Sequence, residues 1–591
     1  MVDQFGYRTV SEKIAVIRNP QTGFDNGTHF TPGARYSLVD VATGQSVLTA
    51  APTAWNSGAT DSSSGDQAWW FDFSGVTAPG DYFVLDTSAN VRSDVFRIAD
   101  DVYRGVLVQS VRMLYYQRDG TSKPAQYAGA DWADGAAHTA MCGLYSDGSA
   151  PKDLHGGWFD AGDQNEYANW AASDVIELLR AYLEHPSAFT DDLNIPESGN
   201  GVPDLLDEVK WELDWLTRMQ DGGGGGSVLS VVGHQGGSPP SSDTQPCKYG
   251  PASTSATLTT AAAFAFASRV LGGVAAFGTA YPGYAAGLLT RATSAWTWAG
   301  ANPTVTFANT GLVAAGEQEV DATGRMLKKL QAAVFLYEAT GDATYKTFFD
   351  ANYASVNLIS SGFTDPALVE RQDTLLEYTR ATGATAASVT QILDVFKSAM
   401  NGADHFGALS SSTDPYLAHL NGYYWGSNQI KGAEGGLFED VIVFGVDATR
   451  NADAARAAER YVHYLHGVNP LQLVYLSNMG AYGAAKSVTR FFHTWFAHGS
   501  QWDTAGVSQF GPPPGYLTGG PNPSYSWDGC CPGGCSGNNC GAAVLAPPAN
   551  QPDQKAYLDF NDGWPIDSWS VTEPDVMYQA HYIRLLSKFV P

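Results

Sequence analysis

The spacing of hydrophobic residues changes once along the chain, from a strand-like period to a helical one. Up to residue 98, short β-rich runs at residues 36–41, 81–86 and 91–98 are separated by turns that contain glycine and proline. Short strands at this spacing are typical of a small sandwich of two antiparallel sheets. We therefore predict a β-sandwich domain at residues 1–98.

Beyond residue 103, apolar residues recur at the spacing of a helix face. One such stripe, with spacings of 4, 3, 4 and 3, is formed by Val202, Leu206, Val209, Leu213 and Leu216. Pro203 suits the first turn of this helix, and the glycines at 222–226 end it. Similar patterns predict helices at residues 174–183, 256–270, 284–298, 326–340, 454–465 and 576–588. Helices joined by long loops indicate an α-helical barrel or toroid over residues 99–591.

The composition excludes several classes of partner. The formal net charge is −27, which argues against nucleic acid or an anionic membrane surface as a partner, because binding either needs clustered basic side chains. No run approaches the roughly 20 apolar residues that span a bilayer. A neutral polysaccharide is compatible with this charge. Aromatic residues make up 12% of the chain. A large core accounts for most of them. A sugar-binding cleft, in which aromatic rings stack on the faces of pyranose rings, would account for the surplus.

The six cysteines indicate whether the protein works in an oxidising or a reducing compartment. Four lie close together, at Cys530, Cys531, Cys535 and Cys540, and the others are Cys142 and Cys247. The cluster fits either a four-thiolate metal site or two local disulfides, and its spacing lacks the paired CxxC pattern of zinc sites. We predict two disulfides, with the pairing open. An even count of disulfide-forming cysteines favours a secreted, extracellular protein, although no signal peptide is visible in the chain.

Paired carboxylates are the clearest candidates for chemistry. Residues 156–163 read Gly-Gly-Trp-Phe-Asp-Ala-Gly-Asp, so Asp160 and Asp163 are three positions apart and can address one water molecule in a tight turn. Glycoside hydrolysis with inversion needs one carboxyl to protonate the leaving oxygen and another to take a proton from the attacking water. The alternative is that either aspartate caps the helix that follows.

The string at residues 156–163 resembles the nucleophilic-water motif of glycoside hydrolase family 9. The N-terminal segments at 2–7 and 72–74 resemble the immunoglobulin-like module that precedes the catalytic domain in one branch of that family. Further segments at 197–208, 425–428 and 467–470 are also similar, so the resemblance covers essentially the whole chain. It implies an immunoglobulin-like β-sandwich followed by an (α/α)6 barrel. It also implies endo-β-1,4-glucanase (cellulase) activity with inversion and without a cofactor for catalysis.

The resemblance assigns roles to three acids. Asp163 matches the general base, Asp160 the residue that helps to hold the water, and Glu573 the general acid. The segment around Glu573 departs from the family, because Thr572 stands where Asn is usual. Pro574 suggests a helix start, where the dipole would favour the ionised form of Glu573, so that burial would have to raise its pKa again. The alternative is that Glu573 and Asp575 only complement that dipole.

Four further residues are candidates for substrate contact. Tyr578 falls where the family places a substrate-contacting Tyr, and His493 falls at the first His of a His-His-Arg clamp. Trp425 and Tyr516 can line subsites, with loop packing as the alternative for both.

Metal sites are also implied by the resemblance. Relatives often hold a structural zinc with Cys and His near the catalytic motif, where this chain has His138, Cys142 and His155. Asp119 replaces the first expected Cys, and Cys142 can instead pair with Cys247, so zinc is not expected. A structural calcium has oxygen ligands available at Asn200 and Asp204, beside Asp207 and Glu208. The family's helical Asp-Glu calcium pair is replaced by lysines at 328 and 329.

Two rival functions stay open. One is an exo-acting relative, such as a cellobiohydrolase, in which the long loop at 499–561 closes one end of the cleft. The other is a carbohydrate-binding protein that has lost catalysis. Retention of Asp160, Asp163 and Glu573 argues against the second. We expect a monomer that acts on β-1,4-glucan and binds neither nucleic acid nor membranes.

Overall fold

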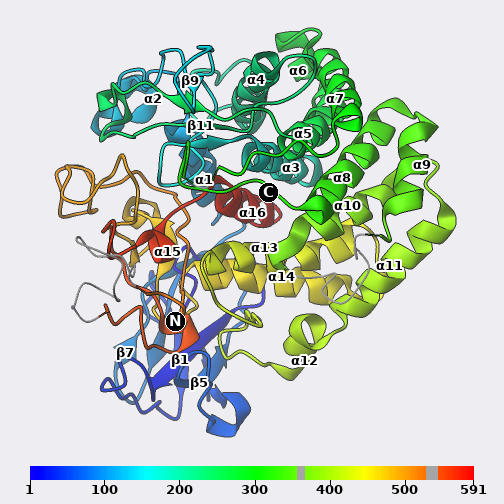
Figure 1. Cartoon of the computed structure of the whole chain (residues 1–591). Helices are drawn as coiled ribbons and strands as arrows, with labels where there is room; N and C mark the ends of the chain where they lie inside the picture. Colours follow the sequence, from blue (N-terminus) through cyan, green and yellow to red (C-terminus); the bar gives the residue numbers. More distant parts are fainter. Residues whose placement is uncertain (310, 356–365, 527–543) are drawn as a thin grey trace. The chain divides into compact units, whose positions relative to one another are not determined.

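The computed structural model describes residues 1–309, 311–355, 366–526 and 544–591, and the chain forms two compact units (Figure 1). The first unit comprises residues 1–110, 400–442 and 447–591. The second comprises residues 111–399 and 443–446. Among the described residues, no helix is long and apolar enough to cross a membrane.

The first unit contains the predicted β-domain. One sheet has the order β1 (Ile14–Pro20), β5 (Asp66–Asp72) and β4 (Thr53–Ala54). The other has the order β3 (Ser46–Ala50), β2 (Tyr36–Asp40), β6 (Gly80–Asp86) and β7 (Val91–Arg92), and β8 (Phe96–Ile98) also pairs with β6. Alternate residues of these strands build one core that includes Leu38, Phe71, Tyr82, Val84 and Phe96.

The predicted strands at 36–41 and 81–86 are confirmed, but the one at 91–98 is wrong as a single strand. It is divided into β7 and β8 at Ser93. The Val84 backbone N–H donates to Ser93 Oγ (3.0 Å), and the Ser93 N–H donates to the Val84 carbonyl (2.9 Å). A side-chain hydroxyl thus replaces one backbone carbonyl of the ladder, which interrupts the strand.

The rest of the first unit consists of helices and short strands. The helices are α12 (Ala408–Ser411), α13 (Ser427–Val443), α14 (Asn451–Leu465), α15 (Trp569–Thr572) and α16 (Val576–Ser587), and the strands are β13 (Val474–Ser477) and β14 (Ser487–Val488). α14 buries an apolar face that includes Ala454, Tyr461 and Leu465, and it contacts α16. The helices predicted at 454–465 and 576–588 are confirmed.

The second unit is mainly helical. Its longer helices are α3 (Ala168–Glu184), α4 (Asp204–Gly223), α5 (Thr254–Gly272), α7 (Tyr284–Ala301), α8 (Ala322–Thr340), α9 (Ala343–Asn352), α10 (Val369–Arg380) and α11 (Ala386–Met400). The shorter ones are α2 (Ala125–Ala128) and α6 (Ala275–Ala280). The helix α1 (Arg104–Gln117) begins in the first unit and ends in the second. Figure 1 shows α5 beside α3, α7 and α8, which it contacts. The predicted helices here are confirmed, although Pro203 is the N-cap of α4 and not part of its first turn.

The second unit also contains a small sheet, one strand of which follows residues 156–163 closely in sequence. Its strand order is β10 (Glu166–Tyr167), β11 (Val231–Gly233), β12 (Lys248–Tyr249) and β9 (Gly143–Leu144). The disulfide Cys142–Cys247 joins the residues immediately before β9 and β12. The pairing that the sequence allowed for Cys142 is therefore confirmed.

Candidate active site

The two aspartates of the motif lie in a loop before β10 and do not cap a helix. The next helix, α3, begins at Ala168, and its N-cap is Tyr167, with no side-chain hydrogen bond to the helix. The capping interpretation of Asp160 and Asp163 is therefore wrong for this helix.

The backbone on both sides of Asp160 is fixed by Gln117, the last residue of α1. The buried Gln117 amide donates to the carbonyls of Phe159 (3.1 Å) and Ala161 (2.8 Å). The Asp160 N–H donates to the carbonyl of Asn165 at 3.0 Å. Asp160 is only 8% exposed. These bonds fix the backbone around Asp160 in a buried position.

Asp163 is held by Asn165. The Asn165 N–H donates to Asp163 Oδ1 (3.1 Å) and the side-chain amide donates to Oδ2 (2.6 Å). Burial raises the pKa of Asp163, and the two hydrogen bonds from Asn165 oppose that shift. A carboxylate with a raised pKa is a stronger proton acceptor once ionised, as a general base requires.

We expect Asn165→Ala to shift the acid limb of the pH–kcat/KM profile to higher pH. The variant loses the amide that stabilises the ionised form of Asp163, so the pKa of Asp163 rises and the base is protonated over a wider range. A hydrogen bond to a charged group is worth about 1.5–3 kcal/mol, which corresponds to about 1–2 pH units. Asn352→Ala is the control, because the Asn352 amide donates to the Phe348 carbonyl and not to a carboxylate among the described residues. An unshifted limb would contradict the role of Asn165.

The start of the motif is packed tightly against α4. Gly157 has φ +84°, and a Cβ there would lie 2.7 Å from Glu166 Oε1 and 2.8 Å from Trp215 Cγ, so only glycine fits. The Trp158 N–H donates to Glu212 Oε2 (2.6 Å), and the Trp211 indole N–H donates to the Gly157 carbonyl (2.9 Å). α4 therefore supports the loop that carries both aspartates.

Buried charges anchor the same region. Arg118 Nε donates to Glu208 Oε2 at 3.0 Å, and its two terminal nitrogens bind both oxygens of Glu197 at 3.0 Å each. Both Arg118 and Glu208 are almost fully buried. Burial raises the pKa of Glu208 to about 7, although Arg118 lowers it. The arginine follows Gln117 directly and so ties the end of α1 to α4.

Glu573, in the first unit, lies between two helices and not at a helix start. It is half-buried and is the C-cap of α15. The next helix, α16, begins at Val576, and its N-cap is Asp575, which accepts from the N–H groups of Met577 (2.7 Å) and Tyr578 (3.2 Å). The predicted helix start at Pro574 is therefore wrong by two residues. Asp575, not Glu573, complements the dipole of α16.

Thr572, which directly precedes Glu573, is held by three hydrogen bonds. Its hydroxyl lies 2.9 Å from the Phe560 carbonyl and 3.1 Å from the Ser568 carbonyl, and it accepts from the Phe492 N–H at 3.1 Å. Pro574 forms a bridge with Thr518. Backbone segments distant in sequence therefore converge on the residues that flank Glu573.

Of the four predicted substrate contacts, the structure brings two together. Trp425 is 48% exposed, and the next residue, Gly426, has φ +83°. A Cβ on Gly426 would lie 2.9 Å from the hydroxyl of Tyr578, so the glycine makes room for that hydroxyl. Asn428 fixes the segment by donating from its backbone and side chain to the carbonyls of Gly519 and Thr518 (2.9 Å each). Trp425 and Tyr578 thus lie near one another in the first unit.

The other two predicted contacts, Tyr516 and His493, are buried among aromatic side chains. Tyr516 is fully buried and His493 is 1% exposed. Tyr516 stacks on Phe491 (ring centroids 5.3 Å apart), and His493 packs on Phe496 (4.5 Å). The Trp495 N–H donates to His493 Nδ1 at 3.1 Å. The loop-packing alternative describes Tyr516 well, and the substrate role of His493 gains no support from its position.

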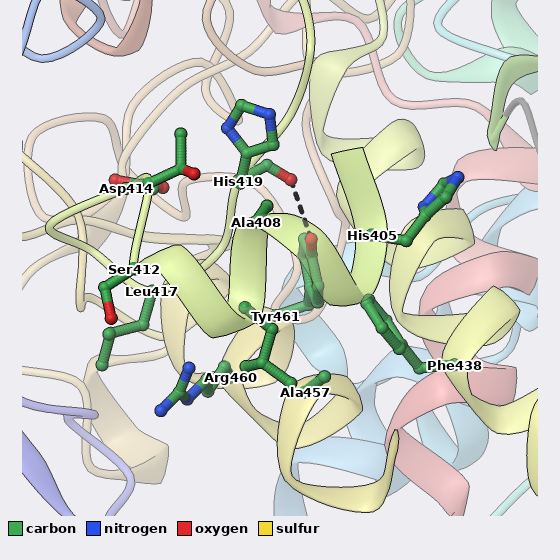
Figure 2. A pocket seen from close by; sticks show the side chains of 12 residues that line it. His405, Ala408, Ser412, Asp414, Leu417, His419, Phe438, Ala457, Arg460 and Tyr461 are labelled. Carbon is green, nitrogen blue, oxygen red and sulfur yellow. Dashed lines mark hydrogen bonds between the residues drawn. The ribbon is translucent and has the colours of Figure 1, made fainter. Parts of the chain in front are cut away.

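A small cavity in the first unit is unrelated to the three acids. It measures about 20 Å³. Residues of α12, α13 and α14 line it, including Phe438 of α13 and Tyr461 of α14, and so do His405 and His419, which lie outside these helices. Figure 2 shows the hydrogen bond from the Tyr461 hydroxyl to the His419 carbonyl, 2.8 Å long. A space of this size holds about one water molecule. None of the three acids lines it, so it is not the candidate active site.

The expected calcium ligands have other partners. Asn200 Nδ2 donates to both oxygens of Asp207 (3.3 and 3.1 Å), whereas Asp204 Oδ2 accepts from the Leu193 N–H (2.6 Å) and the Ser198 hydroxyl (2.8 Å). Burial raises the pKa of Asp204 to about 6. The calcium site at Asn200 and Asp204 stays a prediction.

A different cluster can hold a metal ion. The zinc set considered from the resemblance does not form, because Cys142 is in a disulfide and the partly exposed His155 pairs with Asp153. Instead, ligand atoms of Asp119, His138 and His234 lie within 4.8 Å of one another. Sequence reasoning missed His234, since it follows β11 and no local motif marks it. Cys530, Cys531, Cys535 and Cys540 lie outside the described residues.

Comparison with known proteins identifies relatives over the whole chain. The profile of glycosyl hydrolase family 9 matches residues 103–586, and that of the cellulase N-terminal ig-like domain matches residues 1–90. A cellulose 1,4-beta-cellobiosidase of Acetivibrio thermocellus is 27% identical, with 88% of this chain and 61% of the relative covered. Endoglucanase C of Cellulomonas fimi is 30% identical, with 78% and 44% covered. The chain therefore spans 61% and 44% of the length of these two relatives.

Two further similarities cover nearly the full length of both chains. A xyloglucan-specific endo-beta-1,4-glucanase of Bacteroides ovatus is 27% identical, with 99% of this chain and 92% of the relative covered. The crystal structure of a metagenome-derived glycoside hydrolase family 9 endoglucanase has a TM-score of 0.80 at 25% identity and covers 100% of this chain and 98% of its own. These matches confirm the predicted fold class, an immunoglobulin-like β-sandwich followed by an (α/α)6 barrel.

Proposed function

Because the chain belongs to glycosyl hydrolase family 9 and has the immunoglobulin-like N-terminal domain of cellulases, we propose that it is an inverting endo-β-1,4-glucanase. Its substrate is cellulose or a related β-glucan. The observation that carries the proposal is the loop at 156–163, in which Gln117 and Asn165 fix the positions of Asp160 and Asp163 ahead of a helix that neither aspartate caps.

The three acids divide the reaction between them. Asp160 and Asp163 hold a water molecule, and Asp163 accepts its proton as the oxygen attacks the anomeric carbon. Glu573 gives its proton to the leaving glycosidic oxygen, the C–O bond breaks, and the new hemiacetal has the inverted configuration. Proton exchange with solvent restores both acids. Inversion requires the two carboxyl groups to be about 6.5–9.5 Å apart, and no cofactor takes part.

The exposed ring of Trp425 and the nearby Tyr578 are the proposed substrate contacts. A flat aromatic ring that is half exposed suits stacking against the C–H face of a glucose unit. The names of the relatives include endoglucanases, a xyloglucan-specific enzyme and a cellobiosidase, so an exo-acting enzyme is the second candidate. We further propose a domain boundary between residues 98 and 99, at the end of β8. We also propose that the protein is secreted and monomeric, and that it binds neither nucleic acid nor membranes.

Hydrolysis of carboxymethyl cellulose tests this function. Endo action lowers viscosity steeply while few reducing ends form, whereas exo action releases reducing sugar with little change in viscosity. Asp163→Ala is the control for contaminating cellulase. Binding without any release of reducing sugar would overturn the proposal in favour of a non-catalytic carbohydrate-binding protein.

A further inference from the structure

A fully buried lysine in the first unit has no role in the proposed reaction. Lys431 lies on α13, and its side chain is 0% exposed. Among the described residues, its Nζ bonds to a carbonyl and a phenol hydroxyl and not to a carboxylate. Burial lowers the pKa of the Lys431 ammonium to about 7, although the charges of Asp414 and Glu434 oppose that shift. A buried ammonium without a paired carboxylate is costly, so its contacts call for an explanation.

The Lys431 ammonium holds two points of one loop. This loop, residues 412–426, runs from the end of α12 to the start of α13 without helix or strand. Lys431 Nζ donates to the carbonyl of Ala418 and, at 2.7 Å, to the hydroxyl of Tyr423. Because Lys431 belongs to the second turn of α13, it ties the loop back to the helix that the loop leads into.

Aromatic faces complete the surroundings of the ammonium. Nζ lies 3.9 Å from the ring centroid of Tyr464, 4.9 Å from that of Tyr423 and 5.9 Å from that of Tyr461. A cation within about 6 Å of an aromatic face is attracted to it, more strongly when water is excluded. The Tyr461 hydroxyl also donates to the His419 carbonyl of the same loop at 2.8 Å (Figure 2). Lys431 and α14 therefore hold the loop together.

The tip of the loop, residues 421–425, has one buried side chain, Tyr423. The other residues of the tip are exposed, and Trp425 is 48% exposed. The Tyr424 carbonyl accepts from the Ser427 N–H at 3.0 Å, which closes a tight turn with Trp425 as its first central residue. The position of the Trp425 ring therefore depends on where the side chain of Tyr423 is anchored.

We propose that Lys431 is a positioning residue for the glucan-stacking ring of Trp425. Lys431 fixes the hydroxyl of Tyr423, Tyr423 fixes the tip of the loop, and the tip presents the Trp425 ring in one orientation. Lys431 is buried and acts only through Tyr423. A ring that is held in place before binding loses less conformational freedom on binding, which increases affinity. The role rests on the proposed function in one respect, namely that Trp425 stacks on a glucan.

A role in stability alone would have a different signature. An apolar side chain in place of a buried ion is often neutral or stabilising, and any loss of folded protein would lower only the number of binding sites. The dissociation constant of the remaining folded protein would stay unchanged. A loss of positioning, in contrast, would raise the dissociation constant of the folded protein.

Titration calorimetry with cellohexaose tests the role independently of hydrolysis. All variants are made in the Asp163→Ala background, so that the glucan stays intact. Trp425→Ala should weaken binding about 2–10-fold, as expected for the loss of one aromatic stack. Lys431→Met should weaken binding at least about 2-fold. Added to Trp425→Ala, it should have no further effect, because it acts through that ring.

Tyr423→Phe is the second variant, since it keeps the ring and removes only the hydroxyl that Lys431 holds. It should weaken binding in the same direction, also if Lys431→Met does not fold. Lys588→Met is the matched control, because that lysine contacts α13 nearer its C-terminal end, at Glu439. The control should bind cellohexaose as tightly as the background protein. Circular dichroism shows which variants are folded.

Unchanged affinity in every folded variant of Lys431 and Tyr423 would overturn the positioning role. So would the absence of cellohexaose binding by the background protein, or additive losses in the double variant of Lys431 and Trp425. Hydrolysis of carboxymethyl cellulose by the wild type is measured in parallel. Hydrolysis together with unchanged affinity rejects only the positioning role, and affinity that depends on Lys431 without hydrolysis rejects only the proposed function.

Discussion

Asp163→Ala and Glu573→Ala should both lower kcat on cellulose, by about 10²–10⁴-fold each, but they should respond differently to the leaving group. Glu573 protonates the leaving oxygen, and a nitrophenolate or fluoride leaves with little protonation. The Glu573 variant should therefore recover much of its rate on aryl or fluoride glycosides. The Asp163 variant should not recover, because the attacking water still lacks its base. Steady-state kinetics on a series of cellobiosides with graded leaving-group pKa values measures the contrast.

Asp575→Ala is the matched control for the acid. It removes a carboxylate two residues from Glu573 and costs the N-cap of α16, which is worth about 1 kcal/mol of stability. Its activity should show the same leaving-group dependence as the wild type. The assignment fails if the Asp163 variant is the one rescued, or if both variants respond alike while still folded.

Arg118→Met should destabilise the protein by about 3–5 kcal/mol. The arginine is buried and binds Glu208 and Glu197, so its loss leaves Glu208 buried without its counter-charge. Urea unfolding followed by circular dichroism measures the change. Arg218→Met is the control, since Arg218 and its partner Asp153 are both exposed and such pairs are worth about 0–1 kcal/mol. Equal effects of the two substitutions would show that the buried network does not hold α1 to α4.

The helical fold was readable from the sequence where one face of each helix is buried. The stripe from Leu206 to Leu216 lies on the buried face of α4, and Val202, its first predicted member, precedes the N-cap of that helix. The strands β1 and β5 went unpredicted, because neither alternates simply: β5 contains adjacent tryptophans at 69 and 70, and β1 buries three consecutive residues, Ala15, Val16 and Ile17. The break at Ser93 depends on a side-chain hydrogen bond to a neighbouring strand, which hydrophobic spacing does not reveal.

The site was predictable to the extent that it lies in contiguous motifs. Residues 156–163 and Glu573 were found from such strings, and their catalytic roles remain predictions. The burial of His493 and Tyr516 arises from aromatic packing between segments that the sequence does not mark as neighbours. His234 joins Asp119 and His138 through the short sheet that carries β10 and β11, so only the three-dimensional structure reveals that cluster.

The configuration of the first product tests the central claim most directly. Proton NMR of the wild-type enzyme acting on a soluble cello-oligosaccharide, recorded before mutarotation, should show the α-anomer at the new reducing end. An attack by water activated by Asp163, with Glu573 protonating the leaving oxygen, inverts the β-linkage in a single step. Initial formation of the β-anomer would mean retention through a covalent intermediate, and it would contradict this account.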